Sequence, residues 1–224
     1  MKGFIRANKG FLLFMLLFGV FRTAVADWNP IPSASMRPNL LEGDVVFVNR
    51  LAFNVKVPLT DHVLAHTGEP QRGDVVTFSS PVDGTRLIKR IAGLPGDTVE
   101  LRNERLIING VAAAYDEPQR VSEPLGDGQV AALRMSERLG AGAHAHRIQL
   151  LPQAPTYARD FGPVRVPAGA YLMLGDNRDN SGDSRYFGFV PRHLLIGRAE
   201  RLLVSADTQG NWAPRFERFG MSLK

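Results

Sequence analysis

The sequence predicts a mostly β protein, with an antiparallel β-sheet domain, a smaller subdomain inserted into it and one N-terminal transmembrane helix before it. Three observations predict this fold class. Glycine and proline contribute 22 and 15 of the 224 residues, about 17% against a typical ~12%, which favours a turn-rich β architecture. Short β-branched and aromatic runs, bounded by turn residues, recur along the chain. The longest apolar run, residues 11–21, lies near the N-terminus and follows basic residues.

The basic charge of the chain is concentrated at its N-terminus. The formal net charge is +5, and residues 1–22 carry four basic side chains and no acid. Because the rest of the chain is nearly neutral, we expect no basic face of the kind that binds nucleic acid. The chain contains no cysteine, which excludes disulfides and thiol chemistry. The five histidines are scattered without a metal-ligand spacing, so we expect no metal and no cofactor.

The apolar segment that follows has two interpretations. As a cleaved secretory signal, it has basic residues, an apolar core at 11–21 and an A-x-A site at Ala24-Val25-Ala26. As a membrane anchor, residues 10–27 extend about 27 Å at 1.5 Å per residue, which is long enough for the hydrocarbon core. In both cases residues 1–9 stay in the cytoplasm and the remainder is exported. Taken alone, the segment favours the cleaved signal.

The exported part, residues 28–224, is expected to form the β-domain. The pair Asn103-Glu104 is expected to turn one hairpin, and Asn109-Gly110 is a strong signal for another. Residues 112–165 contain fewer long apolar runs, and we interpret them as a subdomain inserted into the β-domain. The polar residues 205–224 are expected to pack irregularly on the surface. The predicted strands are 44–50, 75–79, 86–92, 98–102, 106–108, 147–151, 170–174 and 197–204.

A candidate nucleophile lies in residues 31–38, IPSASMRP. Two serines, Ser33 and Ser35, flank one alanine, and the neighbouring prolines fix their own φ angles. A loop that is stiffened in this way can hold a hydroxyl group at one location. The plainer interpretation is a Pro/Ser linker that leaves the membrane.

A reactive serine needs a base, and no histidine lies in a recognisable catalytic motif. Of the five lysines, only Lys89 lies mid-strand between apolar neighbours, and alternation puts it on the same face as Leu87 and Ile91. An inward lysine is desolvated, which lowers its pKa from about 10.4 by up to ~3–5 units. The alternative is a lysine at a strand edge that faces solvent.

Four segments of the chain are 31–38 (IPSASMRP), 71–76 (QRGDVV), 87–97 (LIKRIAGLPGD) and 175–190 (GDNRDNSGDSRYFGFV). In this order they resemble the sequence boxes of bacterial type I signal (leader) peptidases. The resemblance covers residues 22–204, and residues 133–138 and 146–148 are also similar to the inserted subdomain of Gram-negative members. One departure is clear, because Gram-negative relatives have two membrane spans before the nucleophile and this chain has room for one.

The resemblance implies a role for each matching residue. Ser35 would be the nucleophile and Lys89 the general base, while the backbone N–H of Ser35 and the hydroxyl of Ser33 would form the oxyanion hole. The supporting residues would be Ser181, which orients the lysine, and Asp183 and Arg185, which brace the site as an ion pair. The residues that would line shallow pockets for the substrate are Ile31, Met36, Leu40, Leu87 and Ile88.

The resemblance also implies a function and a location. The protein would be a serine endopeptidase without a cofactor that removes N-terminal signal peptides after small residues at P1 and P3. It would be a single-pass protein of the bacterial inner membrane with residues 28–224 in the periplasm. Its partners would be preprotein signal peptides, membrane lipid and, by proximity, the Sec/Tat export machinery.

The family retains its N-terminal segment, so the resemblance favours an uncleaved anchor at 10–27, with Ala24-Val25-Ala26 as a remaining self-cleavage site. Two other functions stay open at this point. One is another Ser/Lys peptidase of related fold, such as a conjugative-transfer peptidase or a self-cleaving repressor. The other is a non-enzymatic, membrane-anchored β-domain that keeps the boxes as structure.

Overall fold

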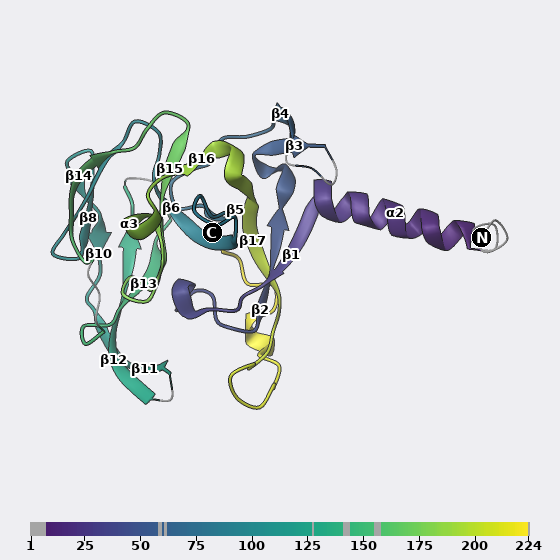
Figure 1. The fold of residues 1–224 in the computed structure, drawn as a ribbon. Coiled ribbons are helices and arrows are strands. Elements are labelled where there is room, and N and C mark those ends of the chain that lie inside the picture. The colour runs from purple at the N-terminus through teal and green to yellow at the C-terminus, as the bar shows by residue number, and fades with distance from the viewer. Residues whose placement is uncertain are drawn as a thin grey trace.

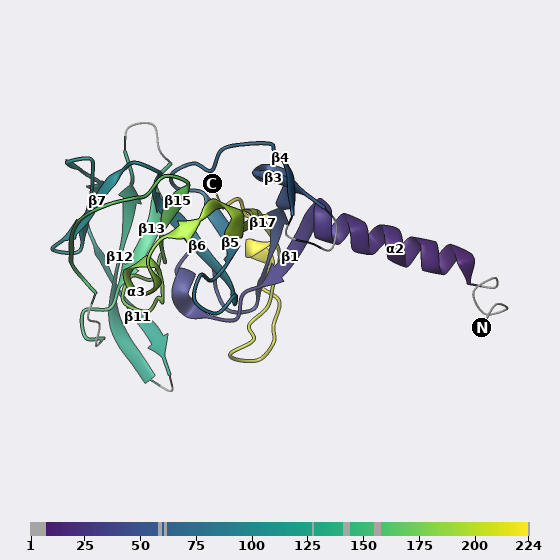
Figure 2. The ribbon, with the colours of Figure 1, turned by 45° about the horizontal axis from the view of Figure 1, so that its top comes forward.

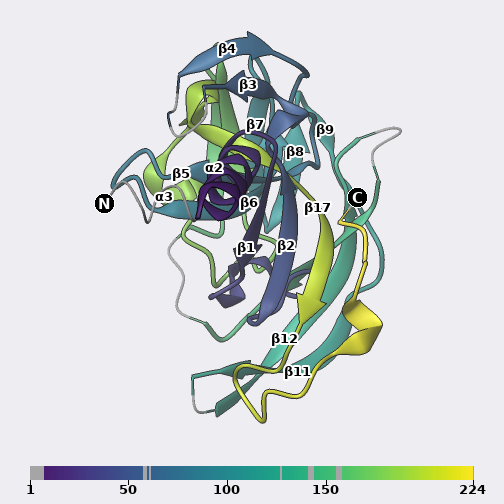
Figure 3. The ribbon, with the colours of Figure 1, turned by 90° about the vertical axis from the view of Figure 1, so that its right-hand side faces the viewer.

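A seven-stranded antiparallel sheet forms the centre of the protein (Figure 1). The computed structural model describes residues 8–57, 60, 62–126, 128–140, 144–154 and 158–223. Seen along the N-terminal helix, the first two strands and β17 lie side by side (Figure 3). In sheet order the strands are β1 (Ala26–Pro30), β2 (Asp44–Asn49), β17 (Leu195–Ser205), β5 (Val75–Ser79), β6 (Arg86–Gly93), β15 (Ala170–Leu174) and β16 (Val190–Pro191).

Three smaller antiparallel sheets complete the β structure. One contains β14 (Phe161–Arg165), β7 (Thr98–Arg102), β8 (Arg105–Ile108) and β9 (Val111–Ala112). A second contains β10 (Ala114–Tyr115), β12 (Gly128–Arg138), β11 (Gln119–Leu125) and β13 (His146–Leu150). The third pairs β3 (Asn54–Lys56) with β4 (Val63–His66). The predicted mostly β, antiparallel fold is confirmed.

Short helical turns connect these strands. The turn that bears Ser35 is η1 (Ala34–Met36), and the segment after β15 forms α3 (Ser184–Phe187). The remaining turns are η2 (Arg50–Ala52), η3 (Arg192–Leu194) and η4 (Phe216–Arg218).

Turn residues place two hairpins where the sequence predicts them. Asn103 and Glu104, which join β7 to β8, have φ angles of 50° and 61°. Asn109 and Gly110, which join β8 to β9, have φ angles of 53° and 79°. Two consecutive positive φ angles are typical of a type I′ turn, whose twist matches that of the strands it connects.

The N-terminal helix, α2 (Lys9–Ala24), projects away from the β structure in both Figure 1 and Figure 2. It has 16 residues and none of them is buried. No helix in the described part of the chain is both long enough and apolar enough to cross a membrane. Of the predicted segment 1–9, residues 1–7 lie outside the described residues.

The predicted helical span 10–27 is too long at its C-terminal end. The helix ends at Ala24, and Ala26 and Asp27 pair with Asn49 and Val48 of β2. These pairs take the backbone into an extended conformation that a helix cannot share, and they bury both side chains. Apolar composition alone did not separate the end of the helix from the first strand.

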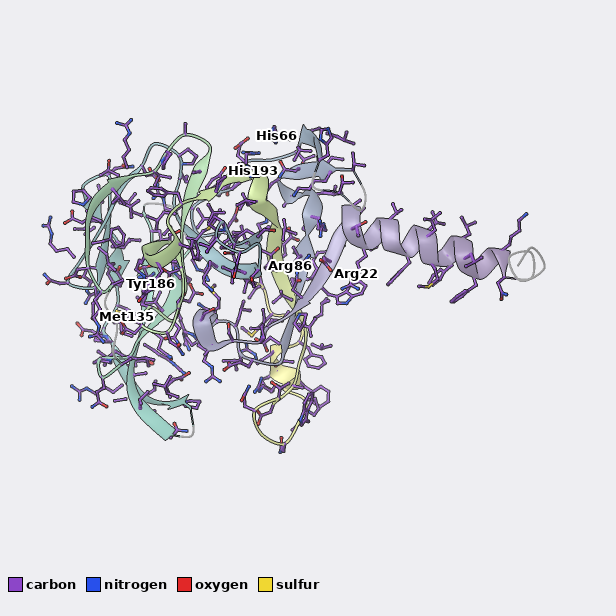
Figure 4. All side chains as sticks on the ribbon, in the orientation of Figure 1. Arg22, His66, Arg86, Met135, Tyr186 and His193 are labelled. Carbon is purple, nitrogen blue, oxygen red and sulfur yellow. The ribbon has the colours of Figure 1, made fainter. Side chains whose placement is uncertain are left out.

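Asp27 connects α2 to the β-domain through a cluster of charges. Its carboxylate lies 3.2 Å from Arg22 Nε, 2.9 Å from Arg86 Nη1 and 3.5 Å from Arg50 Nη1. The guanidinium of Arg22 also stacks over the Trp28 ring at 4.5 Å. Figure 4 labels Arg22 and Arg86 at this junction of helix and sheet. These side-chain contacts, together with the backbone connection, therefore fix the direction in which α2 leaves the β-domain.

Candidate active site

The turn that carries Ser35 is held between two buried side chains. Ile31 and Met36 both pack in the core cluster beneath β2 and β17. The backbone of Ile31 exchanges hydrogen bonds with β2 and the preceding turn, at Asp44 O and Gly43 N. Arg37 N–H donates to Ala34 O and closes the 3₁₀ turn. These contacts fix the backbone at Ser35, as expected for a stiff loop rather than a free linker.

Lys89 lies against this turn. Its Nζ is 2.8 Å from Ser35 Oγ and 3.0 Å from the carbonyl oxygen of Ile88. From Lys89 onward strand β6 is buried on both faces, and Lys89 itself is only 3% exposed. The prediction that Lys89 points inward is confirmed, and the solvent-facing alternative is wrong.

Burial changes the acid–base behaviour of Lys89. Desolvation lowers the pKa of its ammonium group from 10.5 to about 8, although the negative charges of Asp183 and Asp176 raise it. At pH 7.5 a group with this pKa is neutral in roughly a quarter of the molecules, compared with about one in 800 for an unperturbed lysine. A neutral amine within hydrogen-bond distance of a hydroxyl can accept its proton.

Ser33 lies at the open side of the turn. Its side chain is exposed, and its Oγ is 3.3 Å from Ser35 Oγ. Ser35 lies in the first turn of η1, where a backbone N–H has no acceptor within the turn. Two donors beside the Ser35 hydroxyl are therefore available to a developing negative charge.

Asp183 and Arg185 form a buried ion pair behind the site. Arg185 Nε and Nη2 each lie 2.8 Å from the Asp183 carboxylate, and both side chains are almost fully buried. Asp183 also accepts a hydrogen bond of 3.0 Å from Gly175 N, and Arg185 donates to Arg178 O. The pair thus connects α3 to the segment that follows β15.

Ser181 is buried beside the nucleophile turn, and its Oγ has no hydrogen-bond partner among the described residues. The hydrogen bond to Lys89 that its expected orienting role requires is absent from this structure. The two recorded hydrogen bonds of Lys89 Nζ go to Ser35 and Ile88 instead.

The five expected pocket residues differ in their exposure. Ile31, Met36 and Leu40 are buried in the core cluster, whereas Leu87 and Ile88 are partly exposed on β6. Leu87 and Ile88 therefore present apolar surface that a peptide can contact directly, and the other three support the turn from beneath.

Sequence reasoning assigned no role to the first residues of the segment 175–190. Asp176 is buried and accepts two hydrogen bonds of 2.8 Å from Arg90 and one of 2.6 Å from Asn39. Burial opposes ionisation of Asp176, but the Arg90 guanidinium outweighs it and holds the pKa of that carboxyl below its usual range. Asn177 N–H donates to Ser35 O at 3.1 Å. The sequence places these residues in one of the matching segments but does not indicate which residues they contact.

Comparisons with known proteins agree on one family. The family model described as signal peptidase, peptidase S26, matches residues 4–204. A signal peptidase I from Pseudomonas fluorescens is 35% identical over 230 residues, covering 97% of this chain and 78% of the relative. A signal peptidase I from Pseudomonas aeruginosa has the same identity and coverage. A solved signal peptidase I from Enterococcus faecalis is 32% identical with a TM-score of 0.34, covering 58% of this chain and 96% of that one.

Gly175 provides a test of how tightly the turn is supported. A Cβ there would lie 2.6 Å from Ser35 O and closer still to Ser181 Oγ. We expect Gly175→Ala to lower the free energy of unfolding by about 1–3 kcal/mol and peptidase kcat/KM by about 10- to 100-fold. Urea denaturation and peptide cleavage measure the two effects.

The matched control is Gly182→Ala in the same segment, where a Cβ meets nothing within 4 Å. It should change stability by less than about 0.5 kcal/mol. Equal behaviour of the two variants would show that Gly175 does not support the turn.

Proposed function

The chain belongs to the signal peptidase family, peptidase S26, and on that premise we propose that it cleaves by a Ser/Lys dyad of Ser35 and Lys89. As a signal peptidase it is a serine endopeptidase that removes signal peptides from preproteins. The observation that carries the proposed mechanism is the 2.8 Å separation between Lys89 Nζ and Ser35 Oγ in a site that excludes most water.

The first half of the reaction forms an acyl-enzyme. Neutral Lys89 takes the proton of Ser35 Oγ as the oxygen attacks the scissile carbonyl. The carbonyl oxygen becomes an oxyanion, which accepts hydrogen bonds from Ser35 N–H and the Ser33 hydroxyl. The tetrahedral intermediate collapses, the C–N bond breaks, and Lys89 returns its proton to the leaving amine of the mature protein. The signal peptide remains as an ester on Ser35.

The second half repeats these steps with water. Neutral Lys89 removes a proton from water as the water attacks the ester carbonyl. The same donors stabilise the second oxyanion, and Ser35 Oγ recovers its proton from Lys89 as the signal peptide leaves. Lys89 must therefore be neutral at the start of each half of the reaction, and its burial favours that form in both.

Three further residues are proposed to support the dyad. The Asp183–Arg185 pair holds Gly175 behind the nucleophile turn. Ser181 lies against the same glycine, from where its hydroxyl is proposed to orient Lys89 during the reaction. The preference for small P1 and P3 residues is proposed to come from Leu87 and Ile88, which leave shallow rather than deep apolar surface.

A membrane location is also proposed. Helix α2 exposes a continuous set of large apolar side chains. Arg22 in its last turn stacks over Trp28 of β1, and cations and aromatic rings favour a membrane interface. In this proposal α2 anchors the protein at the bacterial inner membrane, with the β-domain in the periplasm, although α2 by itself is too short to span the hydrocarbon core. The partners are then membrane lipid and, by proximity, the Sec/Tat export machinery. The exposed residues include Phe11, Leu12, Leu13, Phe14, Leu16, Leu17, Phe18 and Phe21.

The nucleophile and the side-chain oxyanion donor are tested by two variants. Ser35→Ala should abolish cleavage of a model preprotein. Ser33→Ala should fold normally and lose about 10²–10³ in kcat, the usual cost of one oxyanion donor. The control is Ser122→Ala, which removes an exposed serine from β11, a strand of a different sheet from β6. A Ser33→Ala enzyme within about threefold of wild-type kcat would exclude Ser33 from the oxyanion hole.

The base is tested by pH. As the pH falls below about 8 a growing fraction of Lys89 is protonated and cannot accept the serine proton, so kcat/KM should fall as the pH decreases and level off above that value. Lys89→Arg should be inactive at every pH, because a guanidinium does not deprotonate in a protein. Lys56→Arg, which changes another buried lysine, should keep the wild-type profile. Substantial activity in folded Lys89→Arg would contradict the mechanism.

Retention of the anchor is tested by mass. Ala26 and Asp27 are buried and paired with β2. A peptidase therefore cannot bind the Ala26–Asp27 peptide bond in its active site unless β1 separates from the sheet. The intact mass of the purified protein should therefore include residues 10–24, and the protein should stay in the membrane fraction after a carbonate wash. A chain that begins at Asp27 would show that the segment is removed.

A further inference from the structure

Asn177 makes two hydrogen bonds to the turn that carries the nucleophile. Its backbone N–H donates to Ser35 O, and its side-chain Nδ2 donates to Ala34 O, both at 3.1 Å. We infer that Asn177 is a positioning residue that aims the backbone N–H of Ser35 at the oxyanion. This inference rests on the proposed function, because it concerns the same oxyanion hole.

The geometry of a peptide group connects Asn177 to that N–H. The carbonyl of Ala34 and the N–H of Ser35 belong to one planar peptide group, and in a trans peptide they point in opposite directions. When Asn177 Nδ2 holds the carbonyl on one side, the N–H must point out of the other side of the turn. The second bond, to Ser35 O, fixes the next peptide group. Rotation of the Ser35 backbone is thus restrained from both ends.

Asn177 is itself well held. It is 1% exposed, and its backbone lies in a bridge to Gln149 of β13, with Gln149 N–H donating to Asp176 O. The preceding residue, Asp176, is fixed by Arg90. The amide orientation follows from the acceptor, because only the NH₂ group can donate to Ala34 O. The backbone that carries this donor is therefore fixed behind the turn, while the side-chain Oδ1 is buried without a hydrogen-bond partner among the described residues.

The hydrogen bond from Asn177 Nδ2 to Ala34 O also makes the Ser35 N–H a stronger donor. A hydrogen bond to a carbonyl polarises its peptide group and makes the attached N–H a better donor. In a buried site this polarisation is less screened than in water. Asn177 thereby acts on the transition state, where the oxyanion forms, and hardly on the bound substrate, whose carbonyl carries little charge.

The test uses two variants of the full chain in detergent micelles. Asn177→Ala deletes the side-chain donor, and Asn177→Leu deletes it while filling nearly the same volume. Each should lower kcat for a signal-peptide substrate by about 10- to 100-fold, less than or equal to the loss of a whole oxyanion donor. KM should stay within about twofold, and the pH midpoint of kcat/KM should not move, because the base is untouched.

The affinity for a peptide aldehyde distinguishes a lost oxyanion donor from a general loss of structure. It adds to Ser35 Oγ as a hemiacetal whose oxygen occupies the oxyanion position. The affinity of the aldehyde should fall by the same factor as kcat, whereas the affinity of the cleaved signal peptide should not change. The control is Asn54→Leu, which removes another buried asparagine, hydrogen-bonded to His66 in the separate β3–β4 sheet. It should leave kcat and aldehyde affinity as in the wild type.

Each outcome decides the inference. Folded Asn177 variants that keep wild-type kcat, that raise KM instead, or that shift the pH midpoint would overturn it. If both variants fail to fold while Asn54→Leu folds, Asn177 is a structural residue and the inference is wrong. Failure of the proposed function is a separate result, because it would appear as an inactive wild-type enzyme or an active Ser35→Ala enzyme.

Discussion

The chemistry of this protein depends on the desolvation of one amine. A lysine in water is almost always protonated at neutral pH, so a Ser/Lys pair works only where the fold removes water from Nζ. Strand β6 provides that environment, because it is buried on both faces from Lys89 to its end. The turn of Ser35 then closes over Lys89 and brings its hydroxyl to 2.8 Å. The rest of the site keeps these two atoms together while the lowered pKa leaves a substantial fraction of Lys89 neutral.

Two acids near Lys89 act against the desolvation that lowers its pKa. Asp176 and Asp183 both raise the pKa of Lys89, and unpaired they would favour the ammonium. Each forms an ion pair with an arginine, Arg90 and Arg185 respectively, whose positive charge acts in the opposite direction. The acids can therefore serve as hydrogen-bond acceptors for the backbone behind the turn while the pKa of Lys89 stays near 8.

The sequence predicted those features that local chemistry determines. Asn109-Gly110 forms the expected hairpin turn, and the alternation in β6 placed Lys89 inside. Strand β1 was missed, because Ala26 extends the apolar composition of the helix and its pairing partners lie some twenty residues later. Asn177 was also missed, since its contact with Ala34 joins residues 143 apart in the chain. No local pattern encodes a hydrogen bond between two loops, so such contacts need the fold itself.

Strand β1 has a consequence for where the nucleophile lies. Helix α2 ends two residues before β1, and the turn of Ser35 begins four residues after it. A strand of five residues extends about 17 Å, and pairing with β2 makes this length rigid. Asp27, at the helix end of the strand, fixes the angle through Arg22, Arg50 and Arg86. If α2 anchors the protein as proposed, a rigid strand rather than a flexible linker sets the height of Ser35 above the bilayer. A substrate that is itself tethered to the membrane then meets the nucleophile at one fixed depth.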